Sequence, residues 1–259
     1  MDILEKQGFL IDIDGTVLRG DQLIPGAAEA IKSLQEQGKK VVFLSNRGNI
    51  SRKTCLEKMR RLGIEVDKED ILLSSYVAST FLKAHFPHAK IWVLGDHGLR
   101  EELLETRLIM AEAPTEADWL VVTLHEHLTY EDLNNAFRAV KSGARILATN
   151  ADKSFPREDG EAIDVGGMLG AIEATTNHRV DIVVGKPSHI MVNTALDHLG
   201  LTADQCVMIG DSLGSDISMG KLFGFQTVLV LSGGTTKKDL DNSPIQPDVV
   251  LDSIARLVQ

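Results

Sequence analysis

Short apolar segments alternate with amphipathic helical segments along the whole chain, and this alternation constrains the fold more than any other feature. Continuous runs of Val, Ile and Leu are typical of strands that are covered on both faces. The predicted strands are Phe9–Ile13, Val41–Ser45, Ile71–Ser74, Ile91–Leu94, Trp119–Leu124, Arg145–Thr149, Val180–Val184, Cys206–Ile209 and Thr227–Leu231. Helical patterns lie between them, at Gly26–Gln37, Ser51–Leu62, Tyr130–Lys141, Ser188–Leu199 and Ser215–Phe223. Repeated βα units predict an α/β fold with a doubly wound parallel sheet and helices on both sides.

Composition is that of an ordinary globular protein, large enough for one large domain or two smaller ones. The chain has 259 residues, 43% of them hydrophobic, so a core can form without disulfides or a structural metal. The formal net charge of −10 disfavours nucleic-acid binding, although a local metal or lysine can still attract a small phosphorylated ligand. We expect no membrane segment and a cytoplasmic location, because neither a signal-peptide pattern nor a long apolar run is present. Cys55 and Cys206 are expected to be buried free thiols.

The first predicted strand ends in two acids, in the segment Phe9–Val17. The spacing of Asp12 and Asp14 places both side chains on the same side of an extended chain. Charge at the end of a buried strand is costly unless it is paired or binds a metal. The carboxyl ends of strands are also where doubly wound sheets bind ligands. The two carboxylates can therefore hold a divalent cation and act on a phosphate; the alternative is an ordinary Asp-Gly turn.

Three further predicted strands also end in polar residues. Ser45 and Asn46 follow one of them and can donate hydrogen bonds to phosphate, although both also suit a helix cap or a turn. Lys186 precedes a helix start, where anions are favoured, so it can bind phosphate. The alternative interpretation is that Lys186 is an ordinary solvated surface lysine. Asp211 ends the last of these strands, and Asp216 follows at a helix start. The alternative interpretation of Asp216 is that it simply interacts with the positive end of that helix. The common position of these motifs, at carboxyl ends of predicted parallel strands, favours one site for phosphate and metal.

The order of the motifs resembles that of the haloacid dehalogenase superfamily, whose pattern runs DxDGT, then Ser or Thr, then Lys, then GDxxxxD. In this chain the pattern extends from Asp12 to Asp216. Closer likeness to the NagD and 4-nitrophenylphosphatase-like branch comes from Asp14–Val17, Leu44–Asn46, Ala148–Asp152 and Gly185–Ser188. Likeness to the sugar phosphatases encoded with bacterial arabinose-utilisation genes comes from Phe43–Arg52, Ser154–Pro156 and Ala162–Val165. One departure is Ser212, which stands where many NagD-like chains have a charged residue.

The resemblance implies a division of the chain into a catalytic core and a cap. The core is expected to be a Rossmann-like doubly wound sheet built from residues 1–78 and 181–259. Residues 79–180 are expected to form an inserted α/β cap of the C2 type, which would set substrate specificity. Asn150 and Asp152 fall in a strand-end loop of that cap and are expected to reach the substrate; a plain Asn/Asp loop is the alternative.

The resemblance also assigns roles at the site. Asp12 would attack phosphorus and form an aspartyl-phosphate, and Asp14 would act as the general acid and base. Mg²⁺ would bind Asp12, the backbone carbonyl of Asp14 and Asp211, since hard oxygen ligands suit this ion. Asp216 would hold a metal-bound water or orient Lys186. The phosphoryl group would be bound by Ser45, Asn46 and Lys186.

The implied activity is a Mg²⁺-dependent phosphomonoesterase that acts on sugar phosphates and other small phosphorylated metabolites, including p-nitrophenyl phosphate. Hydrolysis of nucleotides or pyridoxal phosphate stays open, as does a phosphotransferase or mutase reaction on the same core. A non-enzymatic phosphate-binding regulator is disfavoured because all the motifs are present. Relatives of this branch often dimerise through the cap, so a homodimer is also open.

Three other features need no catalytic role. We interpret His125–His127 as a solvated loop, because its two histidines lack the further ligands of a zinc site. Thr129 and Asp132 predict a helix N-terminus with a capping acid. Gly166–Gly170 follows no clear strand and does not match a dinucleotide motif, so close helix packing or a hinge is the favoured interpretation.

Overall fold

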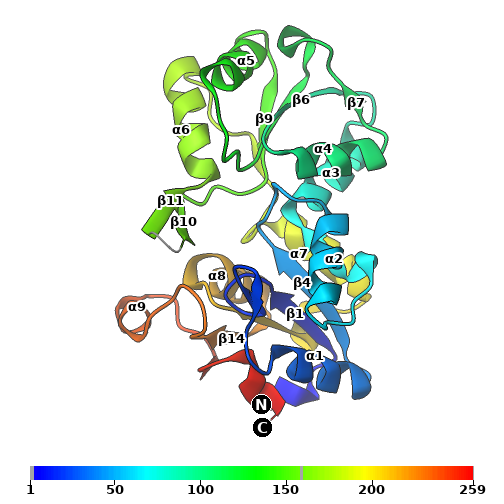
Figure 1. Ribbon diagram of the computed structural model, residues 1–259, viewed down its shortest axis with the longest axis vertical. Coiled ribbons are helices and arrows are strands. Elements are labelled where there is room, and N and C mark those ends of the chain that lie inside the picture. Colours follow the sequence, from blue (N-terminus) through cyan, green and yellow to red (C-terminus); the bar gives the residue numbers. More distant parts are fainter. Residues whose placement is uncertain (1–2, 158–159, 259) are drawn as a thin grey trace. The chain divides into compact units, whose positions relative to one another are not determined.

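The computed structural model describes residues 3–157 and 160–258, and the chain divides into two compact units (Figure 1). The first unit consists of Met1–Ser45, Cys55–Leu72 and Lys186–Gln259. The second unit consists of Asn46–Thr54 and Leu73–Gly185. Residues 46–54, which lie inside the core segment expected from the sequence, group with the second unit.

A six-stranded sheet in the order β15-β14-β13-β1-β4-β5 forms the centre of the first unit. Its strands are β1 (Gly8–Asp12), β4 (Lys40–Ser45), β5 (Ile71–Leu73), β13 (Cys206–Gly210), β14 (Gln226–Val230) and β15 (Val249–Leu251). Strand β1 pairs in parallel with β4 on one side and with β13 on the other, and β14 and β15 continue the parallel pairing. The strand order therefore reverses between β1 and β13. In open α/β sheets, ligands bind at the carboxyl ends of the strands at such a reversal.

Strand β1 is held in the sheet by its apolar side chains. Phe9, Leu10 and Ile11 are fully buried, and burying each such side chain stabilises the fold by roughly 1.5–3 kcal/mol. The strand ends at Asp12, and Asp211 directly follows the neighbouring strand β13. The apolar core thus fixes where these two acids lie, although their charges do not contribute to its stability.

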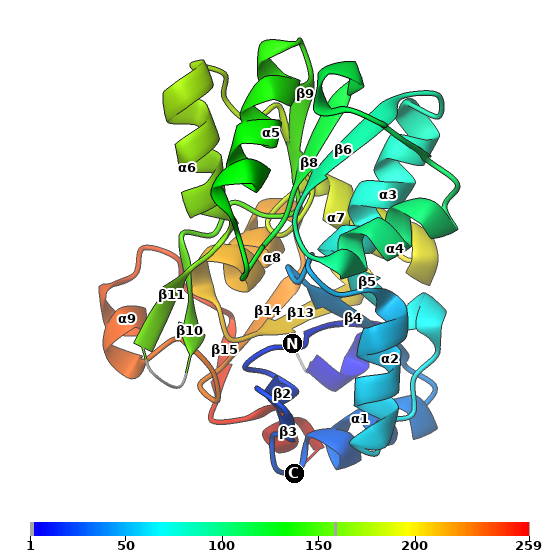
Figure 2. The same ribbon diagram turned by 45° about the horizontal axis from the view of Figure 1, so that its top comes forward.

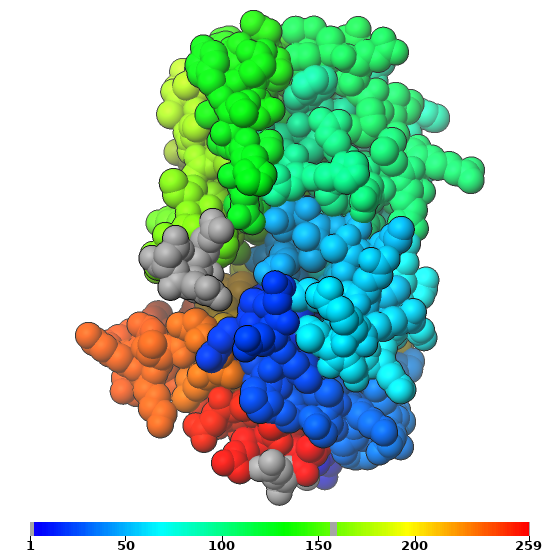
Figure 3. Space-filling model, in the orientation of Figure 1, coloured from blue at the N-terminus to red at the C-terminus, as the bar shows by residue number. Residues whose placement is uncertain are grey.

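Helices and short turns surround this sheet. The helices are α1 (Ala27–Glu36), α2 (Arg52–Arg61), α7 (His189–Leu199), α8 (Ser218–Phe223) and α9 (Lys237–Asn242), with β2 (Leu18–Arg19) and β3 (Gln22–Leu23) as a small hairpin. The shorter turns are η1 (Ile3–Glu5), η2 (Lys68–Asp70), η4 (Ala203–Gln205), the π-helix η5 (Leu213–Ile217) and η6 (Ile254–Val258). In the space-filling view, the blue α1 segment and the red C-terminal segment lie side by side (Figure 3). Their contact is close, because a Cβ at Gly26 would come within 2.6 Å of the Ala255 side chain.

The second unit contains its own parallel sheet, in the order β12-β9-β8-β6-β7. Its strands are β6 (Lys90–Leu94), β7 (Ile109–Met110), β8 (Trp119–Val122), β9 (Arg145–Ala148) and β12 (Ile182–Val183). Its helices are α3 (Ser74–His85), α4 (His97–Glu105), α5 (Tyr130–Lys141), α6 (Val165–Thr176) and the turn η3 (Pro114–Glu116). An antiparallel hairpin of β10 (Ser154–Arg157) and β11 (Gly160–Ile163) extends from the start of α6 (Figure 2).

Local expectations from the sequence are confirmed at several positions. Helix α5 begins with a capping box, in which the Asp132 N–H donates to the Thr129 hydroxyl and the Asp132 carboxylate accepts the Thr129 N–H. Cys55 and Cys206 are buried and free. Within residues 3–157 and 160–258, no helix combines the length and the apolar character that a membrane span requires.

Candidate active site

Three acidic side chains converge at the strand reversal of the first unit. Asp12 ends β1, Asp211 follows β13, and Asp216 lies in the π-helix η5. One carboxylate oxygen from each lies within 4.8 Å of the others. Asp12 and Asp216 are buried, at 5% and 1% exposure, so their charges are largely removed from water. Burial of this kind demands compensating partners.

Lys186 supplies part of this compensation. Its Nζ donates hydrogen bonds to Asp12 Oδ1 at 2.5 Å and to Asp216 Oδ1 at 2.6 Å. Burial alone would lower the pKa of Lys186, but the two carboxylates outweigh burial and raise that pKa above its ordinary value. Lys186 therefore stays charged, and it holds the side chains of Asp12 and Asp216 on either side of it.

One lysine does not neutralise three carboxylates. Burial raises the pKa of Asp12 well above its usual range; Lys186 opposes this rise, whereas Asp216 and Asp211 add to it. Burial likewise raises the pKa of Asp211 to about 6, with the charge of Asp216 contributing. Excess negative charge in a buried cluster favours the binding of a cation.

The donor set of this cluster fits a divalent metal ion. Asp12 Oδ2 is buried and accepts no hydrogen bond from the residues that the structure describes. An orphaned buried carboxylate oxygen is costly, and a cation beside it would remove that cost. Three carboxylates within reach of one another are the oxygen ligands that hard divalent cations prefer.

Asp14 and Ser45 lie at the same edge of the sheet. Ser45, the last residue of β4, donates its hydroxyl to Asp14 Oδ2 at 3.3 Å. The turn after Asp14 requires glycine, because Gly15 has φ of +88° and a Cβ there would overlap the Asp211 carboxylate. Asp14 is expected to bind the metal through its backbone carbonyl, whereas the group of converging acids is defined by side-chain oxygens.

The loop after β14 also belongs to this site, and our sequence reasoning did not single it out. Ser232 donates its hydroxyl to the Gly15 carbonyl at 2.7 Å, and the Gly234 N–H donates to Asp211 Oδ2 at 2.5 Å. Gly233 lies so close to Asp211 that a side chain there would overlap the carboxylate. The available signal was a Ser-Gly-Gly sequence directly after a predicted strand, the same kind of position that revealed the acids.

The remaining predicted residues come together in the second unit. Asn46 Nδ2 donates to Asp152 Oδ2 at 3.0 Å, and Asn150 Nδ2 donates to the Asn46 carbonyl at 3.1 Å. The Asp152 N–H donates in turn to Asn150 Oδ1 at 2.9 Å. Asn46, Asn150 and Asp152 thus form one hydrogen-bonded group, whereas the other predicted site residues belong to the first unit.

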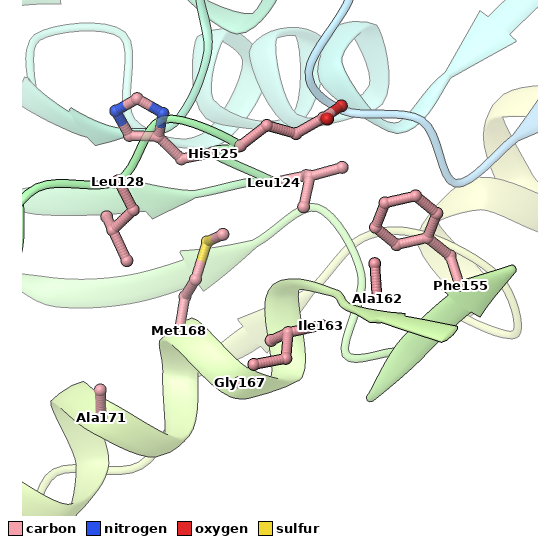
Figure 4. Close-up of a pocket in the computed structure, with 10 residues that line it drawn as sticks. Leu124, His125, Leu128, Phe155, Ala162, Ile163, Gly167, Met168 and Ala171 are labelled. Carbon is pink, nitrogen blue, oxygen red and sulfur yellow. The ribbon is translucent and has the colours of Figure 1, made fainter. Parts of the chain in front are cut away.

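A pocket of about 360 Å³ lies in the second unit, between the hairpin, α6 and the loop after β8 (Figure 4). Its lining is mainly apolar, with Leu124, Leu128, Phe155, Ile163 and Met168 beside His125 and Glu126. His125 is not the solvated residue that the sequence suggested. Its side chain is 18% exposed, and Nδ1 lies 2.9 Å from an Asp96 carboxylate oxygen. Among the described residues, the metal-compatible group does not include His125.

Comparison with known proteins defines the class. Two models of haloacid dehalogenase-like hydrolases match residues 9–108 and 183–257, the ranges that contain the converging acids and Lys186. The chain belongs to the haloacid dehalogenase-like hydrolases, as the motif order predicted, and its fold is the Rossmann-like parallel sheet of that family.

The similar proteins include several phosphatases. Sugar-phosphatase AraL of Bacillus subtilis (strain 168) is 56% identical over 247 residues, covering 95% of this chain and 90% of the relative. The structure of a p-nitrophenyl phosphatase from Archaeoglobus fulgidus superposes with a TM-score of 0.94 at 39% identity, covering 98% of each chain. NagD from E. coli K-12 superposes with a TM-score of 0.86 at 26% identity, covering 96% of this chain and 97% of NagD. The chain is therefore a phosphatase of the NagD-like branch.

Proposed function

We propose that this protein is a Mg²⁺-dependent phosphomonoesterase that releases phosphate from small sugar phosphates through an aspartyl-phosphate at Asp12. The observation that carries the proposal is the buried Lys186 ammonium held between Asp12 and Asp216, next to an excess of negative charge. A metal ion would supply the positive charge that this cluster lacks, and the metal and Lys186 together would attract the anionic phosphoryl group. The names of the relatives, sugar phosphatase and p-nitrophenyl phosphatase, support the substrate class.

In the proposed reaction, a carboxylate oxygen of Asp12 attacks phosphorus while the bond from phosphorus to the ester oxygen breaks. Lys186 holds the Asp12 carboxylate in a fixed orientation for this attack. Asp14 gives its proton to the departing oxygen, so the product leaves as an alcohol. Asp14 then takes a proton from a water molecule, which attacks the aspartyl-phosphate, releases inorganic phosphate and restores Asp12.

The proposed metal ligands are Asp12, Asp211 and the backbone carbonyl of Asp14. When bound, Mg²⁺ would neutralise charge that otherwise makes the carboxylate and the phosphate repel each other. Asp216 orients Lys186, and it is itself fixed by the Ser212 N–H at 3.0 Å. The groups proposed to bind the phosphoryl oxygens are Ser45 and Lys186, whereas the Asn46 amide donates to Asp152.

Residues 79–180, which lie within the second unit, are proposed to form a C2-type cap. Within it, Asn150 and Asp152 are proposed to contact the substrate. Amide and carboxylate side chains can bind the hydroxyl groups of a sugar, because hydroxyls can donate to a carboxylate. They are less suited to binding a second anionic group of a substrate. A cytoplasmic location and a homodimer formed through the cap complete the proposal.

The test is a set of phosphorylated metabolites assayed with Mg²⁺, with release of inorganic phosphate as the readout. We expect sugar phosphates to give the highest kcat/KM and p-nitrophenyl phosphate to be hydrolysed as well. A second phosphorylated product instead of free phosphate would indicate a phosphotransferase or mutase. Highest kcat/KM with nucleotides or pyridoxal phosphate would refute the sugar class while leaving the phosphatase chemistry intact.

A further inference from the structure

The junctions between the two units lie directly beside residues of the proposed phosphate site. Ser45 ends a segment of the first unit and Asn46 begins one of the second; Gly185 ends that unit and Lys186 returns to the first. Asn46 and Gly185 are packed together inside the second unit. A Cβ at Gly185 would lie 2.5 Å from Asn46 Oδ1 and would overlap the Thr149 carbonyl. The residues that neighbour Ser45 and Lys186 in the chain therefore press against each other.

Asn46 is held at both its side chain and its backbone. Its amide donates to Asp152 Oδ2 at 3.0 Å. Its carbonyl accepts two hydrogen bonds, from Asn150 Nδ2 at 3.1 Å and from the Ser74 hydroxyl at 2.7 Å. Asn150 and Ser74 are buried, at 3% and 0% exposure, so water does not compete strongly for these bonds. This arrangement fixes both the position and the orientation of Asn46.

The partner of Asn46 is itself rigid. The Asp152 N–H donates to Asn150 Oδ1 at 2.9 Å, and the Asp152 carbonyl accepts the Gly166 N–H at 2.8 Å. A Cβ at Gly166 would approach that carbonyl to 2.8 Å, so glycine is what allows the close contact. The Asp152 carboxylate is thus presented to Asn46 by a backbone that is fixed on both sides.

From this geometry we infer that Asn46 is a positioning residue, whose bond to Asp152 fixes the spacing of Ser45 and Lys186. Consecutive Cα atoms are about 3.8 Å apart across a rigid peptide link, so packing Asn46 against Gly185 limits how far the two flanking residues can separate. The inference rests on the proposed function, in which Ser45 and Lys186 bind the phosphoryl group. A misplacement of about 1 Å in such groups lowers the rate about a hundredfold.

The experiment exchanges the two side chains. The Asn46→Asp variant places two carboxylates next to each other. Combining it with Asp152→Asn restores a hydrogen bond with donor and acceptor reversed and keeps the total charge of the pair. Both variants and Asp152→Asn alone are assayed with p-nitrophenyl phosphate and Mg²⁺, because the nitrophenyl group offers no hydroxyl for Asp152 to contact. Calorimetric binding of inorganic phosphate with Mg²⁺ provides a readout that does not depend on turnover. Asn242→Asp makes the same change at an exposed position of α9 and is the matched control.

We expect Asn46→Asp to lower kcat/KM about a hundredfold and to weaken phosphate binding, because the spacing of Ser45 and Lys186 is no longer fixed. The double variant should recover to within about fivefold of the wild type, since the two changes are coupled. A double variant as impaired as Asn46→Asp would overturn the inference, because Asn46 would then act by touching the substrate. If the wild type has no turnover, the proposed function fails, and phosphate binding across the same variants decides the positioning role.

Gly185→Ala provides an independent variant in case Asn46→Asp does not fold. Its added Cβ would push on Asn46 Oδ1 without changing any charge. We expect kcat to fall more than KM rises, with weaker phosphate binding. Tryptophan fluorescence checks folding, because Trp92 and Trp119 both lie in the second unit. A folded Gly185→Ala variant with wild-type kcat and phosphate affinity would also overturn the inference.

Discussion

Replacing Asp164 with asparagine should stabilise the protein at neutral pH, although Asp164 caps a helix. Asp164 precedes α6, and its Oδ1 accepts the Val165 N–H at 2.7 Å. The residue is 9% exposed. Burial raises the pKa of its carboxyl to about 6, and the nearby charge of Asp152 contributes to the rise. Asparagine is as good an N-cap as aspartate, so Asp164→Asn removes the charge and keeps the hydrogen bond from Val165, although it weakens the hydrogen bond from the Asn150 side chain.

The direction of the pKa shift determines whether ionisation of Asp164 stabilises or destabilises the fold. A carboxyl whose pKa is higher in the folded state than its ordinary 3.8 binds its proton more tightly when folded, so ionisation destabilises the fold as pH rises from 4 towards 6. The full cost is about 3 kcal/mol at pH 7 and about 0.5 kcal/mol at pH 4. Solvent that reaches the carboxylate reduces the cost at pH 7, so we expect Asp164→Asn to gain about 1–3 kcal/mol there.

Urea unfolding followed by tryptophan fluorescence measures this effect directly, because both tryptophans of the chain, Trp92 and Trp119, lie in the unit that contains Asp164. Asp132→Asn is the matched control in the same unit. A hydrogen bond from Thr129 lowers the pKa of Asp132, so this variant should lose stability at pH 7 and approach the wild type in acid. The reasoning is refuted if Asp164→Asn gains nothing at pH 7, or if its gain is the same at pH 4.

Four further predictions concern the catalytic cluster. Asp12→Asn should abolish turnover without loss of folding; measurable kcat in a folded variant, checked by circular dichroism, would remove Asp12 as the nucleophile. Chelation should stop turnover and added Mg²⁺ should restore it. Because burial raises the pKa values of both proposed ligands, that of Asp211 to about 6, and a metal needs these carboxylates ionised, Mg²⁺ affinity should rise at least tenfold per pH unit up to about pH 6. A pH-independent Mg²⁺ titration would contradict that ligand role. Gly15→Ala should lower Mg²⁺ affinity, because its Cβ would displace the Asp211 carboxylate, and calorimetry at pH 7 measures the loss.

The sheet and its acids could be predicted from the sequence because buried parallel strands leave a clear signal. Each strand is a continuous apolar run, and a charged residue at its end interrupts that run sharply. Asp12 and Asp211 lie at the ends of two such runs. These two runs are β1 and β13, which are neighbours in the sheet. The helices that carry an apolar stripe, such as α1 and α5, were predicted for the same reason.

One helix that was missed, α3, buries polar groups as well as apolar ones. Helix α3 has Ser74, Ser75 and Ser79 buried, so it shows no simple apolar face. Ser74 and Ser75 donate hydrogen bonds to the carbonyls of Asn46 and Ile50. Hydrophobic periodicity cannot detect a helix that packs through such bonds, since the partners are distant in sequence and the bonds depend on the finished fold.

The same limit explains the grouping of residues 46–54 with the second unit. Arg52 stacks its guanidinium over the Tyr76 ring at 3.5 Å, and Gly98 approaches the Ile50 backbone so closely that a side chain would overlap it. None of these contacts has a local signature in the sequence.

Asn46 shows what a motif can and cannot specify. Its position after a strand-end serine predicted a residue beside the phosphate, and chain connectivity alone guarantees that proximity to Ser45. The direction of its side chain is decided by Asp152, which lies 106 positions away in the sequence. A motif therefore fixes where the backbone of a catalytic loop lies, whereas the distant acceptor decides whether the amide serves the substrate or the scaffold. The exchange of Asn46 and Asp152 separates these two uses, because it preserves the pair while moving the charge.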